Sequence, residues 1–307
     1  MAILVAGELN VDLILRNYSS FPALGRETLV DDVCLTIGSA SAICASALAR
    51  LGDSVSFAGK VGQDAWGDLC VTSLHDAGVE CSRIVRDAAI KTGITVSISG
   101  PKDRALVTYL GSIEHLRAAD VTDDMLAGFA HLHVSSFFLQ RGLRPGLKQL
   151  FARAHNCGLT TSLDPGFDPE DRWERDLIDT LLETDIFFPN EVELAAMTGN
   201  PDPQKGLQAL KNGRTLFVAK LGANGCMALE HDSIQAVPGF PVTPIDTTGA
   251  GDTFDAGFLH AWLDGESLTS ALRFAAACGA FSTLGAGGTG HQPSAEEARG
   301  FMVQCTR

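Results

Sequence analysis

Asp252 combines a carboxylate with neighbours that have almost no side chain, in the segment IDTTGAGDTFDAGFL (residues 245–259). The three residues before it are small: Gly249, Ala250 and Gly251. Apolar residues follow it at helical spacing: Phe254, Phe258, Leu259 and Trp262. A helix should therefore begin near Asp252, with open backbone N–H groups that favour an anion.

Two roles are open for Asp252. An acid in the first turn of a helix is favoured by the helix dipole, whatever the function. A carboxylate beside an anion site can also accept a proton from an attacking hydroxyl, while a transferred phosphoryl group rests on the N–H groups. The glycines would let a bulky oxyanion approach the backbone closely. The pattern makes Asp252 a candidate general base.

Asn190 and Glu193 follow the apolar run DIFFP and lie three residues apart, on one side of a helix that should begin there. Amide and carboxylate oxygens suit a hydrated Mg²⁺, which takes few protein ligands and keeps several waters. Asn190 is also a good N-cap residue, so helix capping is the alternative. The pair is a candidate magnesium or phosphate site.

Further polar residues lie where strands should end. Asn10 and Asp12 alternate on one face of the strand that leaves LVAG, either as ligand-binding groups or as a polar exposed face. Lys220 comes directly before LGANG, at an expected strand end where a lysine is ordinarily a solvated charge. Asp164 precedes a proline, so it either reaches a site at the strand end or starts a turn.

Two patterns are rejected as sites. The run GAGGTG (residues 285–290) matches the dinucleotide motif GxGxxG, but it follows a helical stretch, and the chain ends about 20 residues later. His131 and His133 would share a strand face, but no third metal ligand is implied, so a structural role is expected. No GxxxxGK[ST] motif occurs, so a phosphate site must be of another kind.

Helices and strands should alternate along most of the chain, which predicts an α/β fold with a mostly parallel central sheet flanked by helices. Ligands bind such sheets at the carboxyl ends of strands, where the candidate residues lie. Alternating runs in about 9–36 and a hairpin in 92–110, around the turn GPKD, break this rhythm. We expect them to form a small β-sheet lid within a single domain of residues 1–307.

Composition limits the class of protein. The chain has 307 residues, 45% of them hydrophobic, and a formal net charge of −14, which argues against binding nucleic acid or an anionic membrane. We find no apolar stretch long enough to span a membrane and no signal peptide. The eight cysteines form no CxxC pair and should be reduced thiols, which indicates a cytoplasmic protein.

Four segments, in a consistent order along the chain, resemble one family. They are GELNVDL, FFPNEVELAAMTG, AKLGANG and DTTGAGDTFDAGF. Together they make the chain similar, over essentially its whole length, to the ribokinase-like carbohydrate kinases, the phosphofructokinase-B family. The resemblance implies a ribokinase-like fold with a Rossmann-like central domain and a small β-sheet lid. It also implies ATP with Mg²⁺ as the phosphoryl donor, and a hydroxyl of a sugar or nucleoside as the acceptor.

The resemblance assigns roles to residues. Asp252 matches the catalytic base, and Glu193 matches a residue that holds Mg²⁺ through water. The anion hole corresponds to Gly249, Ala250 and Gly251. The ATP site corresponds to Asn190, Lys220, Gly222, Gly225, Cys278 and Ser282, the last two near the adenine. Asp246 and the carbonyl of Thr248, with the glycine-rich segment 285–288, resemble the loop that binds K⁺ in some members.

The sequence departs from the family where relatives face the acceptor. Relatives have Gly-Gly followed by an Asn, with a Lys between them in ribokinases. The residues at these positions here are Gly38, Ser39, Ala40 and Ile43. Losing the Lys and Asn makes the pocket less polar and removes the cation that a phosphorylated acceptor would need. The residues that the resemblance places at the acceptor are Asn10, Asp12, Gly38, Ser39, Ile43 and Asp164.

Three hypotheses follow for the function. The first is an ATP-dependent kinase of a small unphosphorylated sugar. The second is a nucleoside kinase of the same fold, whose base would contact the apolar wall of residues 40–43. The third is a non-catalytic ligand-binding protein on a kinase fold, which only the altered segment 38–44 supports. Exposed strand edges in the lid also favour a homodimer.

Overall fold

The computed structural model describes residues 1–18, 20–100 and 104–305. Within them, nine strands form a main sheet in the order β13-β12-β11-β10-β9-β8-β1-β4-β5. These strands are β1 (Ala2–Ala6), β4 (Ser54–Gly62), β5 (Ile84–Asp87), β8 (His131–Val134), β9 (Thr160–Leu163), β10 (Ile186–Phe187), β11 (Leu216–Lys220), β12 (Cys226–Glu230) and β13 (Ser233–Val237). Strands from β11 through β5 pair in parallel, and β12 and β13 are antiparallel. The mostly parallel sheet expected from the sequence is confirmed.

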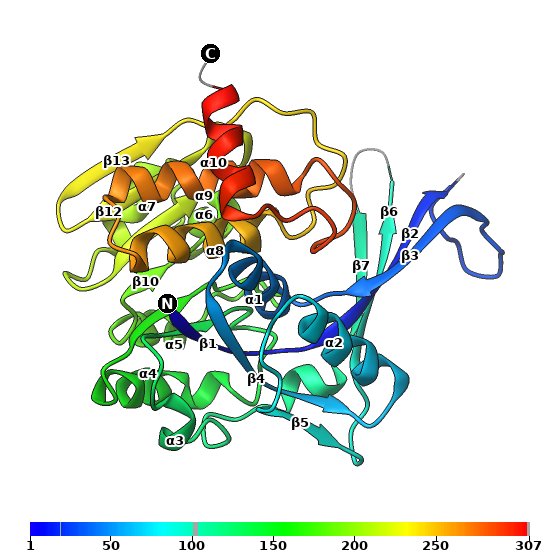
Figure 1. The fold of residues 1–307 in the computed structure, drawn as a ribbon. Helices are drawn as coiled ribbons and strands as arrows, with labels where there is room; N and C mark the ends of the chain where they lie inside the picture. The colour runs from blue at the N-terminus through cyan, green and yellow to red at the C-terminus, as the bar shows by residue number, and fades with distance from the viewer. Residues whose placement is uncertain (19, 101–103, 306–307) are drawn as a thin grey trace.

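Helices cover both faces of the main sheet (Figure 1). One face is covered by α1 (Ala40–Leu51), α2 (Ala65–Asp76), α8 (Ala250–Leu263), α9 (Leu268–Ser282) and α10 (Ala295–Gln304). The other is covered by α3 (Asp123–Leu126), α4 (Leu147–Asn156), α5 (Arg175–Leu181), α6 (Glu191–Thr198) and α7 (Pro203–Leu210). In β1, Ile3 and Val5 pack into the first core, and Leu4 and Ala6 into the second. Burial on both faces explains why this strand is an unbroken apolar run.

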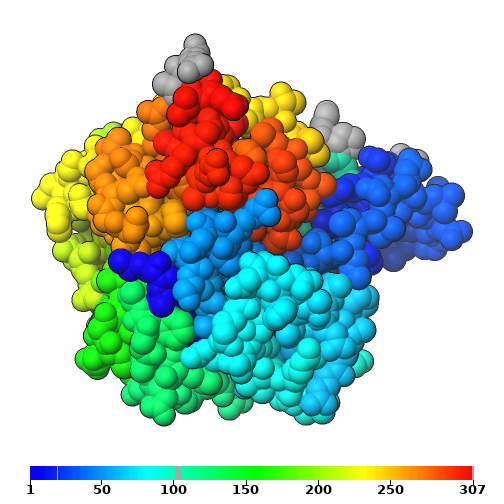
Figure 2. All heavy atoms as spheres, viewed as in Figure 1, coloured from blue at the N-terminus to red at the C-terminus, as the bar shows by residue number. Residues whose placement is uncertain are grey.

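A second sheet, hereafter the small sheet, stands beside the main body (Figures 1 and 2). Its order is β3-β2-β6-β7. Its strands are β2 (Asn10–Tyr18), β3 (Val30–Ile37), β6 (Gly93–Ser99) and β7 (Arg104–Tyr109). The hairpins β2–β3 and β6–β7 are antiparallel, and β2 and β6 pair in parallel. The small sheet therefore comes from the two segments predicted for it, although residues 101–103 of the predicted turn lie outside the described residues.

None of the helices in the described ranges is both long and apolar enough to cross a membrane.

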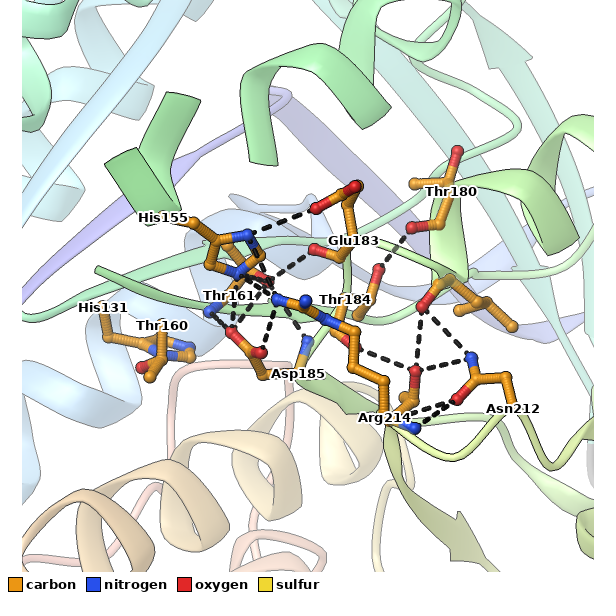
Figure 3. A network of polar contacts seen from close by, with 12 residues as sticks. His131, His155, Thr160, Thr161, Thr180, Glu183, Thr184, Asp185, Asn212 and Arg214 are labelled. Atoms are coloured by element: carbon orange, nitrogen blue, oxygen red, sulfur yellow. Dashed lines mark hydrogen bonds and ion pairs between the residues drawn. The ribbon is translucent and has the colours of Figure 1, made fainter. Parts of the chain in front are cut away.

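Figure 3 shows a polar network of residues at or next to the starts of β8, β9, β10 and β11. These strands are parallel, so the network lies at the opposite end of the strands from the candidate site residues, which follow the strand ends. Asp185 is its centre: its carboxylate accepts hydrogen bonds from the Thr161 amide at 2.8 Å and from Arg214 at 3.1 Å. It also bonds His155 at 2.8 Å. Beside it, His131 bonds Thr160 and Ser162, each at 2.7 Å. The histidines of β8 thus have the structural role expected for them.

Replacing Asp185 by alanine should lower the free energy of unfolding by about 1–3 kcal/mol, because partly buried donors lose their acceptor. Turnover per folded molecule should not change, since the network lies at the opposite edge of the sheet. Urea unfolding measures the loss, and Asp232→Ala is the matched control with an effect near zero, because Asp232 is exposed and its ion pair within the described residues is with Lys211 on the surface. Equal unfolding curves for the two variants would contradict this role.

Candidate active site

The N-terminus of α8 is the centre of the candidate site. Gly249 is the N-cap residue, with φ of 73°, and α8 begins at Ala250, as the sequence predicts. A Cβ at Gly249 would lie 2.8 Å from the Gly288 Cα, so this position combines a left-handed backbone with a close approach of two chain segments. Ala250 and Gly251 line a cavity in front of the helix. The three residues predicted as an anion hole thus lie together at a helix N-terminus.

Behind this turn, three carboxyl groups surround one ammonium group. Oxygens of Asp164, Asp252 and Asp255 lie within 4.8 Å of one another. The Nζ of Lys220 is 2.6 Å from Asp164 Oδ2 and 3.1 Å from each carboxylate oxygen of Asp255. Asp164 follows the end of β9, Lys220 ends β11, and the other two lie in the first turns of α8. Parallel strands thus bring residues far apart in sequence to one edge.

Burial and mutual repulsion control the protonation of this cluster. Burial raises the pKa of Asp252 well above the usual value for aspartate, the charge of Asp164 raises it further, and Lys220 opposes both. Burial also raises the pKa of Asp255. Burial alone would raise the pKa of Asp164, but the charge of Lys220 and several hydrogen bonds lower it. Asp164 therefore carries the negative charge beside Lys220, and the raised pKa values of Asp252 and Asp255 favour the protonated forms of both.

Asp255 was not predicted as a site residue, although its spacing from Asp252 indicated that role. It lies three residues after Asp252, on the same side of α8, so the spacing alone places both carboxyls at one site. Lys220 is only 11% exposed, so the expectation of a solvated charge is wrong. It stands instead between the acid cluster and the cavity, which it lines.

The cavity in front of α8 has a volume of about 330 Å³. Of the residues predicted for the ATP site, Lys220, Gly222 and Gly225 line it. Segment 239–247, including Phe240 and Pro244, forms another wall. The cavity joins the N-terminus of α8 to the turn after β11, an arrangement suited to a nucleotide with its phosphates on the helix.

Two residues predicted near the adenine do not reach this cavity. Cys278 is fully buried and faces Gly257 in α8, whose Cβ position would be 2.9 Å from its Sγ. The Ser282 hydroxyl donates a hydrogen bond to the carbonyl of Gly279 at 2.9 Å. The residues of α9 and its end that line the cavity are Ala276, Gly279, Ala280 and Thr283. The spacing of these residues by three or four positions indicates one face of α9, and the predicted residues Cys278 and Ser282 lie on another face.

Asn190 and Glu193 form a capping box at the start of α6. The Asn190 Oδ1 accepts from the amides of Val192 and Glu193, and Glu193 Oε2 accepts from the Asn190 amide, all between 2.8 and 2.9 Å. The capping alternative is therefore present in the structure. Glu193 is nonetheless buried beside the acid cluster, and burial together with Asp164 raises its pKa to about 7. Neither residue lines the cavity.

The donor set fits a divalent cation. Four buried or partly buried carboxyl groups lie near each other, and Lys220 is the cation that the described residues place among them. The four are Asp164, Glu193, Asp252 and Asp255. An excess of carboxyl oxygens is what Mg²⁺ prefers, through few direct ligands and several waters.

A second, smaller cavity of about 170 Å³ lies between the main body and the small sheet. Asn10, Asp12 and Ser39 line it, as the resemblance implies, and so does Thr248. The Asn10 amide donates to Asp12 Oδ1 at 3.0 Å. Gly38 approaches Asp12 so closely that a Cβ would collide with its carboxylate.

Glu8 also lines this cavity and was missed. It is 3% exposed, and its carboxylate accepts a hydrogen bond from the Ser41 hydroxyl at 2.6 Å. Burial raises its pKa, although hydrogen bonds from Ser41 oppose the change. Glu8 lies two residues before Asn10, so the alternation that selected Asn10 and Asp12 extends to it.

Ile43, predicted to face the acceptor, lies elsewhere. It is 4% exposed and packs behind the anion-hole turn, where its Cγ2 would be 2.9 Å from a Cβ at Gly249. Ser39 is the N-cap of α1, and its hydroxyl accepts from the Ala42 amide and donates to the Glu8 carbonyl. Ala40 lines the cavity in place of Ile43, because the helix turns the latter away.

Asp246 holds together two segments around Gly249. Its Oδ1 accepts from the Thr248 amide at 2.9 Å, and its Oδ2 from the Gly287 amide at 3.0 Å. Arg16 of β2 donates to the same Oδ2 at 3.0 Å. Asp246 and the carbonyl of Thr248 were predicted to bind a monovalent cation, and the structure places a guanidinium group on this carboxylate.

Known proteins resemble this chain over its whole length. A family model described as pfkB family carbohydrate kinase matches residues 2–295. An ATP-dependent ribose-1-phosphate kinase of Halopiger xanaduensis is 30% identical over 304 residues, which cover 98% of each chain.

Two solved structures show how close the fold is. A fructokinase with bound ATP from Xylella fastidiosa has a TM-score of 0.86, with 25% identity over 100% of this chain and 99% of its own. A fructokinase double mutant from Vibrio cholerae O395, with fructose, ADP and a potassium ion, has a TM-score of 0.80, with 28% identity over 98% of each chain. With its ribokinase-like fold, this chain belongs to the pfkB family of carbohydrate kinases.

Proposed function

We propose that this ATP-dependent sugar kinase transfers the γ-phosphoryl group to a hydroxyl of a small unphosphorylated sugar, with Asp252 as general base. The observation that carries the proposal is the position of residues 247–251. Thr247, Ala250 and Gly251 line the larger cavity, and Thr248 lines the smaller one. A nucleotide in the first cavity and an acceptor in the second would thus meet at the N-terminus of α8, beside Asp252.

The chemistry follows from this placement. Asp252 takes the proton of the acceptor hydroxyl, whose oxygen attacks the γ-phosphorus as the bond to the bridging oxygen of ADP breaks. The N–H groups at the start of α8 and the Lys220 ammonium stabilise the charge on the transferred group. When bound, Mg²⁺ would neutralise phosphate oxygens, held through water by Glu193 and the acid cluster.

The lining of the smaller cavity supports an acceptor without a phosphate group. Glu8 and Asp12 supply carboxyl groups, and the hydroxyl groups come from Ser39, Thr95, Ser97, Thr108, Ser136 and Thr248. No Lys or Arg of the described residues lines it, so a phosphate ester would meet two acids and no cation. The nucleoside alternative keeps Ala40 of its expected apolar wall but loses Ile43, which packs outside the cavity.

A panel of acceptors tests this proposal. With Mg²⁺-ATP, ADP release should be fastest with a neutral pentose, hexose or related polyol, slower with nucleosides, and absent with ribose 1-phosphate. The charge in the smaller cavity is the reason, since its acids repel a phosphate and accept from hydroxyls. A coupled ADP assay measures the rates, and a panel without acceptor controls for ATP hydrolysis. Turnover with ribose 1-phosphate alone would overturn the unphosphorylated acceptor; turnover with nothing would favour a non-catalytic protein.

Two further expectations fit the described residues. All eight cysteines are free, which supports action in the reducing cytoplasm.

The small sheet exposes apolar side chains: Val33, Leu35, Leu106, Val107 and Tyr109. An exposed apolar sheet with open edges supports the pairing of two copies as a homodimer.

A further inference from the structure

Arg16 connects the small sheet to the turn that begins α8. It lies in β2, and its Nη2 is 3.0 Å from Asp246 Oδ2, across 230 residues of sequence. Its Nη1 is 3.5 Å from Asp32 in the neighbouring strand β3. The Arg16 side chain is 24% exposed and that of Asp246 is 16% exposed, so this pair is shielded from solvent more than the ion pairs of the open surface.

Asp246 in turn fixes the backbone on both sides of the close contact at Gly249. It accepts from the amide of Thr248, one residue before Gly249, and from the amide of Gly287, one residue before Gly288. Gly249 and Gly288 are the two residues in close approach. A change at Asp246 would therefore move the first residues of α8, where the transferred phosphoryl group has to rest.

The residues around Asp246 do not fit a monovalent cation. A carboxylate has about four acceptor positions, and here the Thr248 amide, the Gly287 amide and Arg16 occupy three of them. Burial would raise the pKa of Asp246, but hydrogen bonds from Gly287 and Thr248 and the charge of Arg16 lower it. The carboxylate is thus ionised, and Arg16, which it shares with Asp32, is the cation beside it.

We propose that Arg16 is a built-in counter-charge that takes the place of a monovalent cation at Asp246, so that this enzyme turns over without potassium. Arg16 is a positioning residue: it acts on the phosphoryl group through Asp246 and the start of α8. The proposal rests on the kinase activity proposed above, but not on the identity of the acceptor.

Arginine suits this role better than a bound ion. A guanidinium group is always charged and its planar donors are fixed in direction, so it can hold Asp246 and contact Asp32 together. It also comes from the small sheet, so the counter-charge is present only while β2 is in place against the main body.

The first experiment compares cations with the unmodified protein. Turnover at constant ionic strength should be equal, within about twofold, in tetramethylammonium, sodium, potassium and caesium chloride. The melting temperature in the presence of Mg²⁺-ADP should also be the same in the four salts. This thermal readout needs no acceptor, so it separates a failure of the present proposal from a failure of the acceptor proposal.

Variants then test Arg16 itself. Arg16→Met should lower kcat roughly 10- to 100-fold, because small displacements of positioned groups have effects of this size. Part of that loss should be restored by potassium or by free guanidinium ion, and KM for ATP should change less than kcat. Arg16→Lys should retain most of the cation-independent rate. Asp32→Asn removes the other partner of Arg16 and is the matched control, with no response to cations.

Several results would contradict the proposed role of Arg16. Activation of the unmodified protein by potassium, or a potassium-dependent melting temperature, overturns the proposal. So does an Arg16→Met protein that is as active as the parent in every salt, or one whose lost activity no cation restores although it melts normally. If Arg16→Met does not fold, Arg16→Lys and the salt series on the unmodified protein decide the matter.

Discussion

Asp252→Asn is expected to lower kcat by about 10²–10⁴-fold while the protein still binds nucleotide. The amide has nearly the same shape but cannot take the acceptor's proton. Asp252 does not line the larger cavity, so the affinity for ADP measured without Mg²⁺ should change little. A coupled ADP assay and calorimetric titration measure the two quantities. Asp264→Asn, an exposed acid just after α8, is the matched control.

Measurements of the melting temperature and of the pH dependence of the rate distinguish a catalytic role of Asp252 from a structural one. The fold raises the pKa of Asp252, so its ionised form opposes folding at neutral pH, and a neutral amide should not lower the melting temperature. In the unmodified protein, the rate should rise with pH as Asp252 loses its proton, at a pH above that of an ordinary aspartate. Near-normal kcat in Asp252→Asn would remove Asp252 from the mechanism.

Lys220→Met should have the next largest effect, a loss of about 10²–10³-fold in kcat, the size found when one electrostatic donor is removed. Lys220 also lowers the pKa of Asp252, so without it the acid limb of the pH–rate profile should move to higher pH. The carboxyls of Asp164 and Asp255 lose their partner, which should destabilise the fold by about 3–5 kcal/mol at neutral pH.

A second variant distinguishes the two consequences of losing Lys220. Lys220→Met combined with Asp255→Asn removes one of the unpaired acids, so stability measured by urea unfolding should recover in part. Turnover should not recover, because the donor beside Gly251 is still missing. Recovery of both quantities together would show that Lys220 serves only the fold. An unchanged acid limb in the single variant would contradict its control of Asp252.

Features set by local sequence were predictable. The apolar run of β1 is typical of a buried strand, and the small residues before Asp252 predicted the start of α8. The two alternating segments predicted the strands of the small sheet. Each of these features depends on residues within about one turn or strand of each other, so periodicity and capping are sufficient to find them.

Contacts between distant segments were not predictable in the same way. Lys220 meets Asp164 across 56 residues, and Arg16 meets Asp246 across 230. Which of several charges become partners depends on strand order, which the sequence alone does not state. The errors at Cys278 and Ile43 have another cause: each residue lies on a helix, and the side of the helix that faces the site was misjudged. That side depends on what the helix packs against.

The link between β1 and β2 has a mechanical consequence. Only residues 7–9 separate the last residue of β1 in the main sheet from the first residue of β2 in the small sheet. If the small sheet rotates against the main body, it pivots about short links such as this one. Residues near the pivot then move least. Glu8, Asn10 and Asp12 lie at or next to this pivot, whereas the far end of β2 has the longest lever arm. These three residues would thus keep their positions during such a rotation, whereas Arg16, farther along β2, would move relative to Asp246.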